Sequence, residues 1–562
     1  MNFMTPDLLL SAGIFLLRVL QPFLALLILY HCFTSLRNHR RGEQPLVELK
    51  DTISGARIPV VYWENTIGRS KSSDILLPDP AVSRDHAVLY RREEGWMISD
   101  THSKAGTKCN GATIQAPTQV RVGDVITLGS TSLSLERADR TGNIHRSWFF
   151  NRSKPCIRPA RLMVLVSFFH ALLAAQLCLP DEGFAWQPLA LWGAFTLVGW
   201  LFLLISRRGF HRSGFELETL AFFLSGLGIL LIYSVDERQA YIQTAAMALG
   251  MVLFCCVLWF MEDPDRVMRW RLPMSILAVL LLAGTLVLGT EVYGAKNWIL
   301  IGPVSIQPSE LVKICFIFVG TSTLNQLQTA KNLTEFLVFT ALCIGALGLM
   351  GDFGTACIFF VTFLIIAFIR SGNLRTIIFI CAGAALGAFV ILQRKPYILD
   401  RFAAWGHVWE YADTTGYQQT HVLSYAASGG MFGVGIGNGN LKYVAAASSD
   451  LVFGMMCEEL GVLLALVVAL AVAALAVYAR MSSATTRSTV YSIAACAAGG
   501  MLVFQSCLNI FGATDILPLT GVTLPFVSMG GSSMMAVWGL LAFIKASDER
   551  TYAVRRANRS RG

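Results

Sequence analysis

The sequence predicts a polytopic all-α membrane protein with a small soluble β-sandwich inserted after its first span. Hydrophobic residues make up 54% of the 562 residues and charged residues only 14%, whereas an ordinary soluble protein has roughly 25% charged residues. Apolar runs near or above the ~18 residues that cross a bilayer as a helix recur along the chain. They predict thirteen spans, beginning at Leu8, Leu162, Trp186, Leu217, Tyr241, Leu272, Leu311, Phe336, Thr355, Thr376, Leu451, Val490 and Phe526.

The first run, in residues 1–36, is expected to be an uncleaved membrane anchor. It lacks the small-residue cleavage site of a signal peptide, and the basic stretch Arg37–Arg41 follows it directly. The remaining organisation is expected to be a soluble module at 47–137, a linker at 138–160, an additional pair of spans at 161–206, the main membrane domain at 215–547 and a basic tail at 548–562.

The basic clusters indicate the orientation, because Lys and Arg near span ends mark the cytoplasmic side of a membrane. Counting spans between these clusters gives a consistent parity when the N-terminus lies outside and the C-terminus inside. The chain is then a multi-pass protein of the cytoplasmic membrane, with its soluble module inside and the polar stretch Arg394–Asp450 outside. Anionic lipid explains the net charge of +9, so no nucleic-acid partner is expected.

The 13 cysteines show no metal-ligand spacing, and most lie in apolar spans. There they are expected to act as small buried hydrophobic residues. The sequence therefore predicts neither a disulfide framework nor a metal site built from cysteines. No cofactor is expected, although assistance by a divalent cation stays open.

The soluble module shows short alternating strands, such as Pro59–Trp63, Ala87–Tyr90 and Trp96–Ile98, which predict a small β-sandwich. Its turns carry several short motifs in a distinctive order, and with them the module resembles a forkhead-associated (FHA) domain. The motifs are Gly68-Arg69-Ser70, Ser83-Arg84-Asp85-His86, Asp100 followed by Ser103, Gly106-Thr107 and Asn110-Gly111.

The FHA resemblance implies binding of phosphothreonine peptides through Arg69, Ser83, Arg84 and Ser103, since a dianionic phosphate needs guanidinium and hydroxyl donors. The chain has Ala105 where the family usually has the Asn that holds the peptide backbone. Other motif residues are expected to shape turns rather than touch a ligand; they are Gly68, His86, Asp100 and Asn110.

The stretch Arg394–Asp450 is a long polar interruption between apolar runs, and it carries several acidic residues, two histidines and a glycine-rich tail. Loops of this length tend to be functional. Distinctive segments of the main membrane domain are Gly294–Trp298, Gln307–Lys313, Gly351–Thr355, Ala412–Asp413, Gly416–Gln418, Asp450, Glu458–Gly461, Asp515–Gly521 and Leu524–Ser533. With these segments, the domain resembles the SEDS (shape, elongation, division and sporulation) family of RodA and FtsW, from about Glu216 to Lys545.

The SEDS resemblance implies ten core helices plus three additional ones here, and a peptidoglycan glycosyltransferase that polymerises lipid II at the outer face of the membrane. It also implies a class B penicillin-binding transpeptidase as partner, in elongation, division or sporulation. Asp413 matches the family's essential loop aspartate and is expected to act as general base for the acceptor hydroxyl. Glu410 is the alternative, because Tyr411–Gly416 departs from the family pattern.

The predicted substrate-binding residues are Glu310, Lys313, Asp352, Arg401 and Asp450. Glu310 and Lys313 share one helix face, so a structural ion pair is an equal alternative to contact with pyrophosphate. For Asp352, the alternative to substrate contact is that its carboxylate caps the helix that begins at Gly354.

Two other functions stay open at this stage. A transporter or flippase of the lipid-linked precursor would share the many spans and intramembrane charges. A phospho-regulated scaffold would explain the departures from the family pattern.

Overall fold

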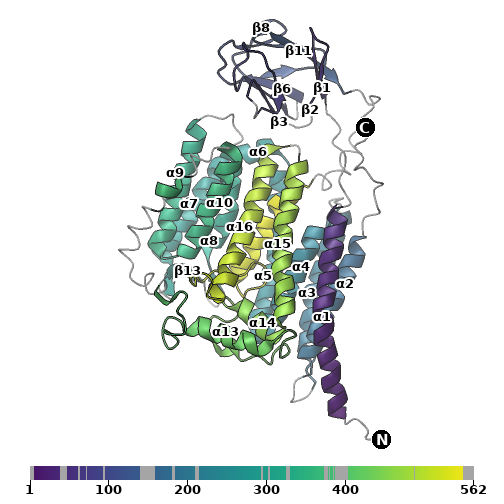
Figure 1. Ribbon diagram of the computed structural model, residues 1–562, viewed down its shortest axis with the longest axis vertical. Helices are drawn as coiled ribbons and strands as arrows, with labels where there is room; N and C mark the ends of the chain where they lie inside the picture. The colour runs from purple at the N-terminus through teal and green to yellow at the C-terminus, as the bar shows by residue number, and fades with distance from the viewer. Residues whose placement is uncertain are drawn as a thin grey trace.

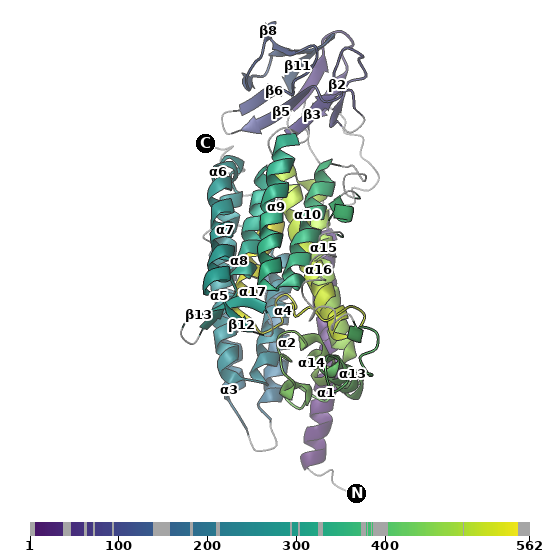
Figure 2. The ribbon, with the colours of Figure 1, turned by 90° about the vertical axis from the view of Figure 1, so that its left-hand side faces the viewer.

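We describe the fold from a computed structural model of the chain. It combines a helical bundle with a separate β-sandwich at one end of that bundle (Figures 1 and 2). The predicted fold class is therefore confirmed. The structure describes residues 6–37, 47–60, 64–70, 73–92, 95–138, 158–179, 184–208, 214–292, 295–301, 304–323, 330–371, 378, 380–383, 385, 403–486 and 488–548.

The sandwich consists of a six-stranded sheet, in the order β2-β1-β11-β10-β7-β8, and a five-stranded sheet, in the order β4-β3-β5-β6-β9. Its first and last strands pair antiparallel, with Val47 opposite Arg137, so the chain enters and leaves along neighbouring strands. Its core is separate from that of the helices. The strands are β1 (Val47–Asp51), β2 (Arg57–Val60), β3 (Glu64–Gly68), β4 (Ile75–Leu76), β5 (Ala87–Arg92), β6 (Gly95–Asp100), β7 (Thr107–Cys109), β8 (Ala112–Thr113), β9 (Thr118–Val120), β10 (Val125–Leu128) and β11 (Thr131–Arg137).

The bundle contains the helices that the apolar runs predict. Eight of the described helices are long and apolar enough to cross a membrane, and α9, α10 and α17 are shorter apolar helices. The helices are α1 (Pro6–Arg37), α2 (Pro159–Leu177), α3 (Gln187–Arg208), α4 (Glu216–Tyr233), α5 (Glu237–Met261), α6 (Pro264–Arg269), α7 (Arg271–Leu288), α8 (Pro308–Thr323), α9 (Ala330–Met350), α10 (Phe353–Ser371), α13 (Tyr417–Gly429), η1 (Leu441–Tyr443), α14 (Val452–Glu459), α15 (Val462–Thr485), α16 (Thr489–Ala513) and α17 (Gly531–Ala546).

Two spans begin later than the sequence predicts, and one lies largely outside the described residues. The run that starts at Leu451 is divided into α14 and α15 at Gly461, whose φ of +88° interrupts the helix. The last span begins at Gly531 rather than Phe526, because Leu524 to Gly530 form a turn instead. The run from Thr376 falls mostly in the part of the chain that is not described.

The polar stretch before Asp450, expected to be a long functional loop, contains α13 and η1 in its described part. These two elements and α14 lie at the end of the bundle opposite the sandwich (Figures 1 and 2). A small sheet of β12 (Thr290–Val292), β13 (Ala295–Ile301) and β14 (Val304–Ile306), which the sequence analysis did not anticipate, precedes α8.

Helix α4 lies at the centre of the bundle, and 94% of the residues in its apolar stretch are buried. It approaches other segments closely through glycine, as expected where helices pack in a membrane. A β-carbon at Gly228 would lie 2.4 Å from the carbonyl oxygen of Val527. The turn before α17 therefore rests directly on the backbone of α4.

We expect Gly228→Ala to destabilise the protein by roughly 1–3 kcal/mol, because the added methyl group meets rigid backbone. Gly284→Ala in α7 is the matched control, since no atom of the described residues outside its own helix lies within 4 Å of its β-carbon position. Thermal unfolding in detergent measures both variants. Equal melting temperatures for Gly228→Ala and the wild type would contradict the close contact.

Candidate active site

Asp413 lies on an exposed series of turns just before α13. Backbone hydrogen bonds close these turns, with the N–H groups of Thr414 and Gly416 both donating to the carbonyl of Tyr411. Gly416 is packed so tightly that a β-carbon would lie 2.3 Å from the carbonyl oxygen of Val408. Within the described part of the chain, no hydrogen bond or ion pair engages the Asp413 carboxylate, so this acid is fixed by its backbone and open at its side chain.

The turns that carry Asp413 are attached to the segment between α16 and α17. The Gly406 N–H donates to the Asp515 carboxylate over 3.1 Å, and the Trp405 indole donates to the Ile516 carbonyl over 3.1 Å. Asp515 adopts a positive φ of 60°, unusual for a residue other than glycine. Asp515, the first residue of the SEDS-like segment Asp515–Gly521, thus binds the turns that carry Asp413, the predicted general base.

Glu410 is the other acid of these turns. Its carboxylate lies 3.7 Å from Nδ1 of His407, and both side chains are largely exposed. The structure therefore leaves Asp413 without a partner among the described residues and gives Glu410 a neighbouring imidazole.

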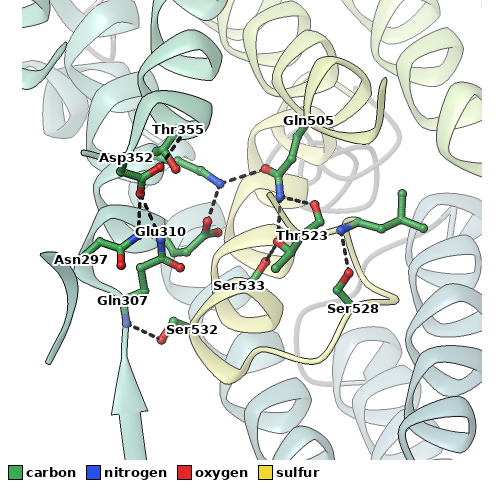
Figure 3. Close-up of polar contacts among 12 residues, drawn as sticks. Asn297, Gln307, Glu310, Asp352, Thr355, Gln505, Thr523, Ser528, Ser532 and Ser533 are labelled. Carbon is green, nitrogen blue, oxygen red and sulfur yellow. Dashed lines mark hydrogen bonds and ion pairs between the residues drawn. The ribbon is translucent and has the colours of Figure 1, made fainter. Parts of the chain in front are cut away.

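Glu310 lies in a buried polar cluster (Figure 3), and Lys313, one helical turn later in α8, pairs with it. The Lys313 ammonium donates to Glu310 over 2.7 Å and to the side-chain oxygen of Gln505 over 2.9 Å. Lys313 is only 1% exposed and Glu310 4%, so both charges lie away from solvent and depend on each other. The geometry is that of the structural ion pair, and it leaves contact with substrate a prediction.

Gln505 and Thr523 extend the cluster toward α17. The Gln505 amide donates to the carbonyl and hydroxyl of Thr523 over 2.9 and 3.1 Å, and the Thr523 and Ser533 hydroxyls lie 2.7 Å apart (Figure 3). The sequence analysis missed Gln505, because a single glutamine in an apolar helix gives no distinctive signal.

Asp352 caps α10 and joins the same region (Figure 3). One carboxylate oxygen accepts the Thr355 N–H over 3.1 Å, as an N-cap does. The other accepts the side-chain amides of Asn297 and Gln307, over 3.1 and 3.2 Å. The predicted capping geometry is therefore present, and the acid also fixes the small sheet and its connection to α8.

Asp450 lies beside the segment that leads to Thr523. The Asn509 side chain donates both to the Asp450 carbonyl over 2.9 Å and to the Val522 carbonyl over 2.8 Å. A β-carbon at Gly521 would lie 3.3 Å from the Asp450 carboxylate. The structure thus groups Asp450 with the cluster around Lys313, whereas Arg401 lies outside the described residues.

A glycine-rich loop, Gly430–Asn440, connects α13 to η1 and wraps the end of α14. The Glu458 carboxylate accepts the N–H groups of Asn440 and Leu441, over 2.7 and 2.9 Å, and the Glu459 carboxylate accepts that of Gly437 over 2.8 Å. Both acids are buried. Glu458 and Glu459 both accept backbone N–H groups of the loop, which explains why two acidic residues are adjacent in the sequence here.

No group of three or more His, Cys, Asp or Glu side chains that could hold a metal ion occurs among the described residues.

In the sandwich, the loops that follow β3, β4 and β6 bring the predicted phosphopeptide-binding residues to one end. The Arg69 N–H donates to the Ser83 carbonyl over 2.9 Å, and the Lys104 N–H donates to the Ser83 hydroxyl over 3.0 Å. The side chains of Arg69 and Arg84 are exposed. Since the Ser83 hydroxyl accepts this bond, its own hydrogen is available to a phosphate oxygen.

Ser103 is engaged differently, because its hydroxyl donates to Asp100 over 2.6 Å and its N–H over 2.9 Å. Thr107 donates to the same carboxylate over 2.7 Å. Burial tends to raise the pKa of Asp100, but the hydrogen bonds from Ser103 and Thr107 outweigh it, so this pKa lies below its ordinary value. Asp100 therefore shapes the loop, as the turn-forming interpretation predicts, and Ser103 has already used its hydroxyl proton.

Comparisons with known proteins agree with both parts of the chain. The family profile of the FtsW/RodA/SpoVE cell cycle proteins matches residues 217–552, and that of the FHA domain matches residues 65–129. The peptidoglycan glycosyltransferase RodA of Mycobacterium tuberculosis is 27% identical over 424 residues, covering 69% of this chain and 90% of RodA. A probable peptidoglycan glycosyltransferase FtsW of Tolumonas auensis is 30% identical over 368 residues, covering 62% of this chain and 95% of its own length.

A solved structure also resembles the chain. It comes from a study of how a peptidoglycan synthase complex coordinates polymerization and crosslinking, with 25% identity and a TM-score of 0.51, covering 60% of this chain and 98% of the other. The profile match extends over more than half of the present sequence. The chain therefore belongs to the FtsW/RodA/SpoVE family of membrane peptidoglycan glycosyltransferases, and it carries an FHA domain in addition.

Proposed function

We propose that this protein polymerises lipid II into glycan strands at the outer face of the cytoplasmic membrane, and that its FHA domain regulates this activity from the cytoplasm. Family membership supports the reaction type, since the relatives are named peptidoglycan glycosyltransferases. The observation that carries the site is the exposed Asp413 carboxylate on turns that are fixed at both ends.

Asp413 acts as general base for the acceptor hydroxyl. The acceptor oxygen attacks the anomeric carbon, the bond from that carbon to the pyrophosphate oxygen breaks, and the lipid pyrophosphate leaves. A positioned carboxylate accepts the proton that the hydroxyl loses in this step, and such assistance contributes roughly 10²- to 10⁴-fold. An acid already saturated with hydrogen bonds would be a poorer acceptor. The exposure of Asp413, beside the engagement of Glu458 and Glu459 with backbone N–H groups, supports this assignment.

The cluster around Lys313 is proposed to line the path of the lipid-linked sugar. Lys313 joins Glu310 of its own helix α8 to Gln505 of α16. Asp352 caps α10 and binds Asn297 of β13 and Gln307, which immediately precedes α8. Substrate contact by these residues, by Asp450 and by Arg401 stays part of the proposal. A cluster whose charges are paired before substrate arrives pays little further desolvation when the pyrophosphate binds.

The orientation is part of the proposal, and the arrangement of the fold and its charges support it. The sandwich and the Asp413 segment lie at opposite ends of the bundle (Figures 1 and 2), and α3, the second helix after the sandwich, ends in the basic residues Arg207 and Arg208. Both features support a cytoplasmic FHA domain and an external catalytic segment.

Two partners follow from the same comparisons. The similar solved structure is that of a peptidoglycan synthase complex, which supports pairing with a class B penicillin-binding transpeptidase. A threonine-phosphorylated protein would bind the FHA domain at Arg69, Ser83 and Arg84, where the exposed guanidinium groups can meet the −1.5 to −2 charge that a phosphate carries at roughly neutral pH.

We expect Asp413→Ala and Asp413→Asn each to lower glycan-strand formation by about 10²- to 10⁴-fold, because the base is lost while the fold is kept. Strand formation from purified lipid II measures this. Glu410→Ala is the matched control, an exposed acid of the same turns, and should keep most of the activity. A fully active Asp413→Ala beside an inactive Glu410→Ala would transfer the role to Glu410.

Cysteine labelling should place the two ends of the bundle on opposite sides of the membrane. Thr415→Cys and Lys104→Cys introduce thiols at exposed positions, whereas Gly416 is unsuitable because a β-carbon there would meet the Val408 carbonyl. A membrane-impermeant maleimide should label Thr415→Cys on intact cells and Lys104→Cys only after permeabilisation, relative to the wild-type background. Labelling of both from one side would refute the orientation.

Phosphothreonine peptides should bind residues 47–137 more tightly than the same peptides without phosphate, and Arg69→Ala should abolish the difference. Ala105→Asn should tighten binding, because it supplies the amide that the family uses to hold the peptide backbone. Isothermal titration calorimetry measures both effects. Arg121→Ala, which removes the same charge in the turn between β9 and β10, is the control; equal binding of both peptide forms would exclude phosphate recognition.

A further inference from the structure

Helix α1 has one buried face that carries polar as well as apolar side chains. The buried positions recur every three or four residues and so lie on one side of the helix; they include Gln21, Ala25, Ile28, Cys32 and Ser35. Helix α1 packs against α2, α4 and α15. A helix that served only to hold the chain in lipid would need no polar residues on such a face, because polar groups at membrane depth are costly.

Arg18 lies on the same face, one turn before Gln21, and reaches the glycine-rich loop. Its Nη1 donates to the Gly433 carbonyl over 3.4 Å. A β-carbon at Gly435 would lie 2.6 Å from Nη2, so the guanidinium rests directly on this glycine, whose φ is +106°. One turn earlier, the ring of Phe15 meets Phe432 edge to face, with centroids 6.4 Å apart.

Lipid phosphate does not account for this arginine. An arginine that extends toward headgroups keeps its charged end in water, whereas the Nε of Arg18 is buried and has no hydrogen-bond partner among the described residues. The guanidinium is therefore turned toward the protein. It contacts the loop from the side opposite to Glu459, whose carbonyl accepts the Gly435 N–H over 2.9 Å.

The glycine-rich loop is connected to the predicted catalytic segment through helix α13. It follows α13, and α13 begins at Tyr417, four residues after Asp413. At the other end of α13, a β-carbon at Gly429 would lie 2.3 Å from the Cys457 carbonyl, so this helix rests on α14. Movement of Gly433 and Gly435 would thus change the support of α13 and, through it, the position of Asp413.

The inner end of α1 is fixed as well. The Ser35 hydroxyl donates to the buried Glu216 carboxylate of α4 over 2.7 Å. Between the two contacts, Pro22 has no N–H to offer the carbonyl of Arg18. One backbone hydrogen bond of α1 is therefore missing at Arg18, where the helix meets the loop.

We propose that Arg18 is a positioning residue for the polymerisation reaction: it holds the glycine-rich loop, and thereby α13 and the Asp413 segment, against the first helix. This inference rests on the proposed function for its catalytic consequence. Residue 18 precedes the region that the family profile matches, so the first helix contributes directly to the support of a family site.

The test uses the full-length protein in detergent with Arg18→Ala, Arg18→Lys and, as control, Leu20→Ala, which alters a lipid-exposed residue of the same helix. Hydrogen exchange followed by mass spectrometry reports on the loop, where the N–H groups of Gly433, Val434, Gly435 and Gly437 are hydrogen-bonded. We expect Arg18→Ala to accelerate exchange in the loop roughly tenfold, the effect of one lost charged hydrogen bond, with α4 and α15 unchanged. Arg18→Lys should lie between Arg18→Ala and the wild type.

Polymerisation of purified lipid II supplies the second measurement. Arg18→Ala should lower kcat roughly tenfold or more with little change in KM, since small misplacements of a catalytic group are costly. Wild-type exchange in the loop of Arg18→Ala, or equal acceleration by Leu20→Ala, would overturn the inference. Accelerated exchange with an unchanged kcat would also overturn it. An inactive wild type beside the expected exchange pattern would refute the proposed function and leave the loop contact established.

Discussion

Charges inside this bundle must be paired, and much of the architecture depends on that constraint. An isolated ion in a low-dielectric interior costs several kcal/mol, and removal of one partner from a buried pair costs roughly 3–5 kcal/mol. Lys313 with Glu310 and Lys545 with Glu218 are both fully or nearly fully buried. The first pair reaches α16 through Gln505, and the second joins α17 to α4. Each pair therefore fixes helices that are distant in the sequence.

The acids of the chain divide by environment, and this division separates support from chemistry. Glu310, Asp352 and Glu458 are buried and bonded to cations, amides or backbone N–H groups. Asp413 is exposed on rigid turns. A carboxylate that organises structure is occupied by its donors, whereas a general base has to be accessible to a hydroxyl. The exposed Asp413 and its exposed neighbour Glu410 meet the second requirement, whereas these buried acids do not.

The sequence predicts the elements of this fold better than their connections. Apolar runs and strand alternation depend on local composition, so the helices and the sandwich could be derived from it. The break at Gly461 could not, because a glycine within an apolar run is compatible with a continuous helix. The i, i+3 spacing of Glu310 and Lys313 indicated their pairing as one of two equal alternatives, and the structure shows the pair. Gln505, the third member of this cluster, lies 192 positions after Lys313 in the sequence. Gly433 lies 415 positions after Arg18. A local sequence pattern cannot predict contacts between residues so far apart in the chain.

The attachment of the sandwich limits where its ligands can act. Strand β1 begins at Val47, and α1 ends at Arg37, so nine intervening residues can span at most about 30 Å. Strands β1 and β11 are neighbours, and the start of β1 lies opposite the end of β11, so both covalent connections leave from the same end of the sandwich. Any protein held by this domain is therefore confined close to the C-terminal end of α1, at an effective concentration on the order of millimolar. A weak intrinsic affinity of the sandwich for its ligand is then sufficient for high occupancy, provided that the partner is already bound nearby. The short covalent connection thus compensates for part of the affinity that a free domain would need.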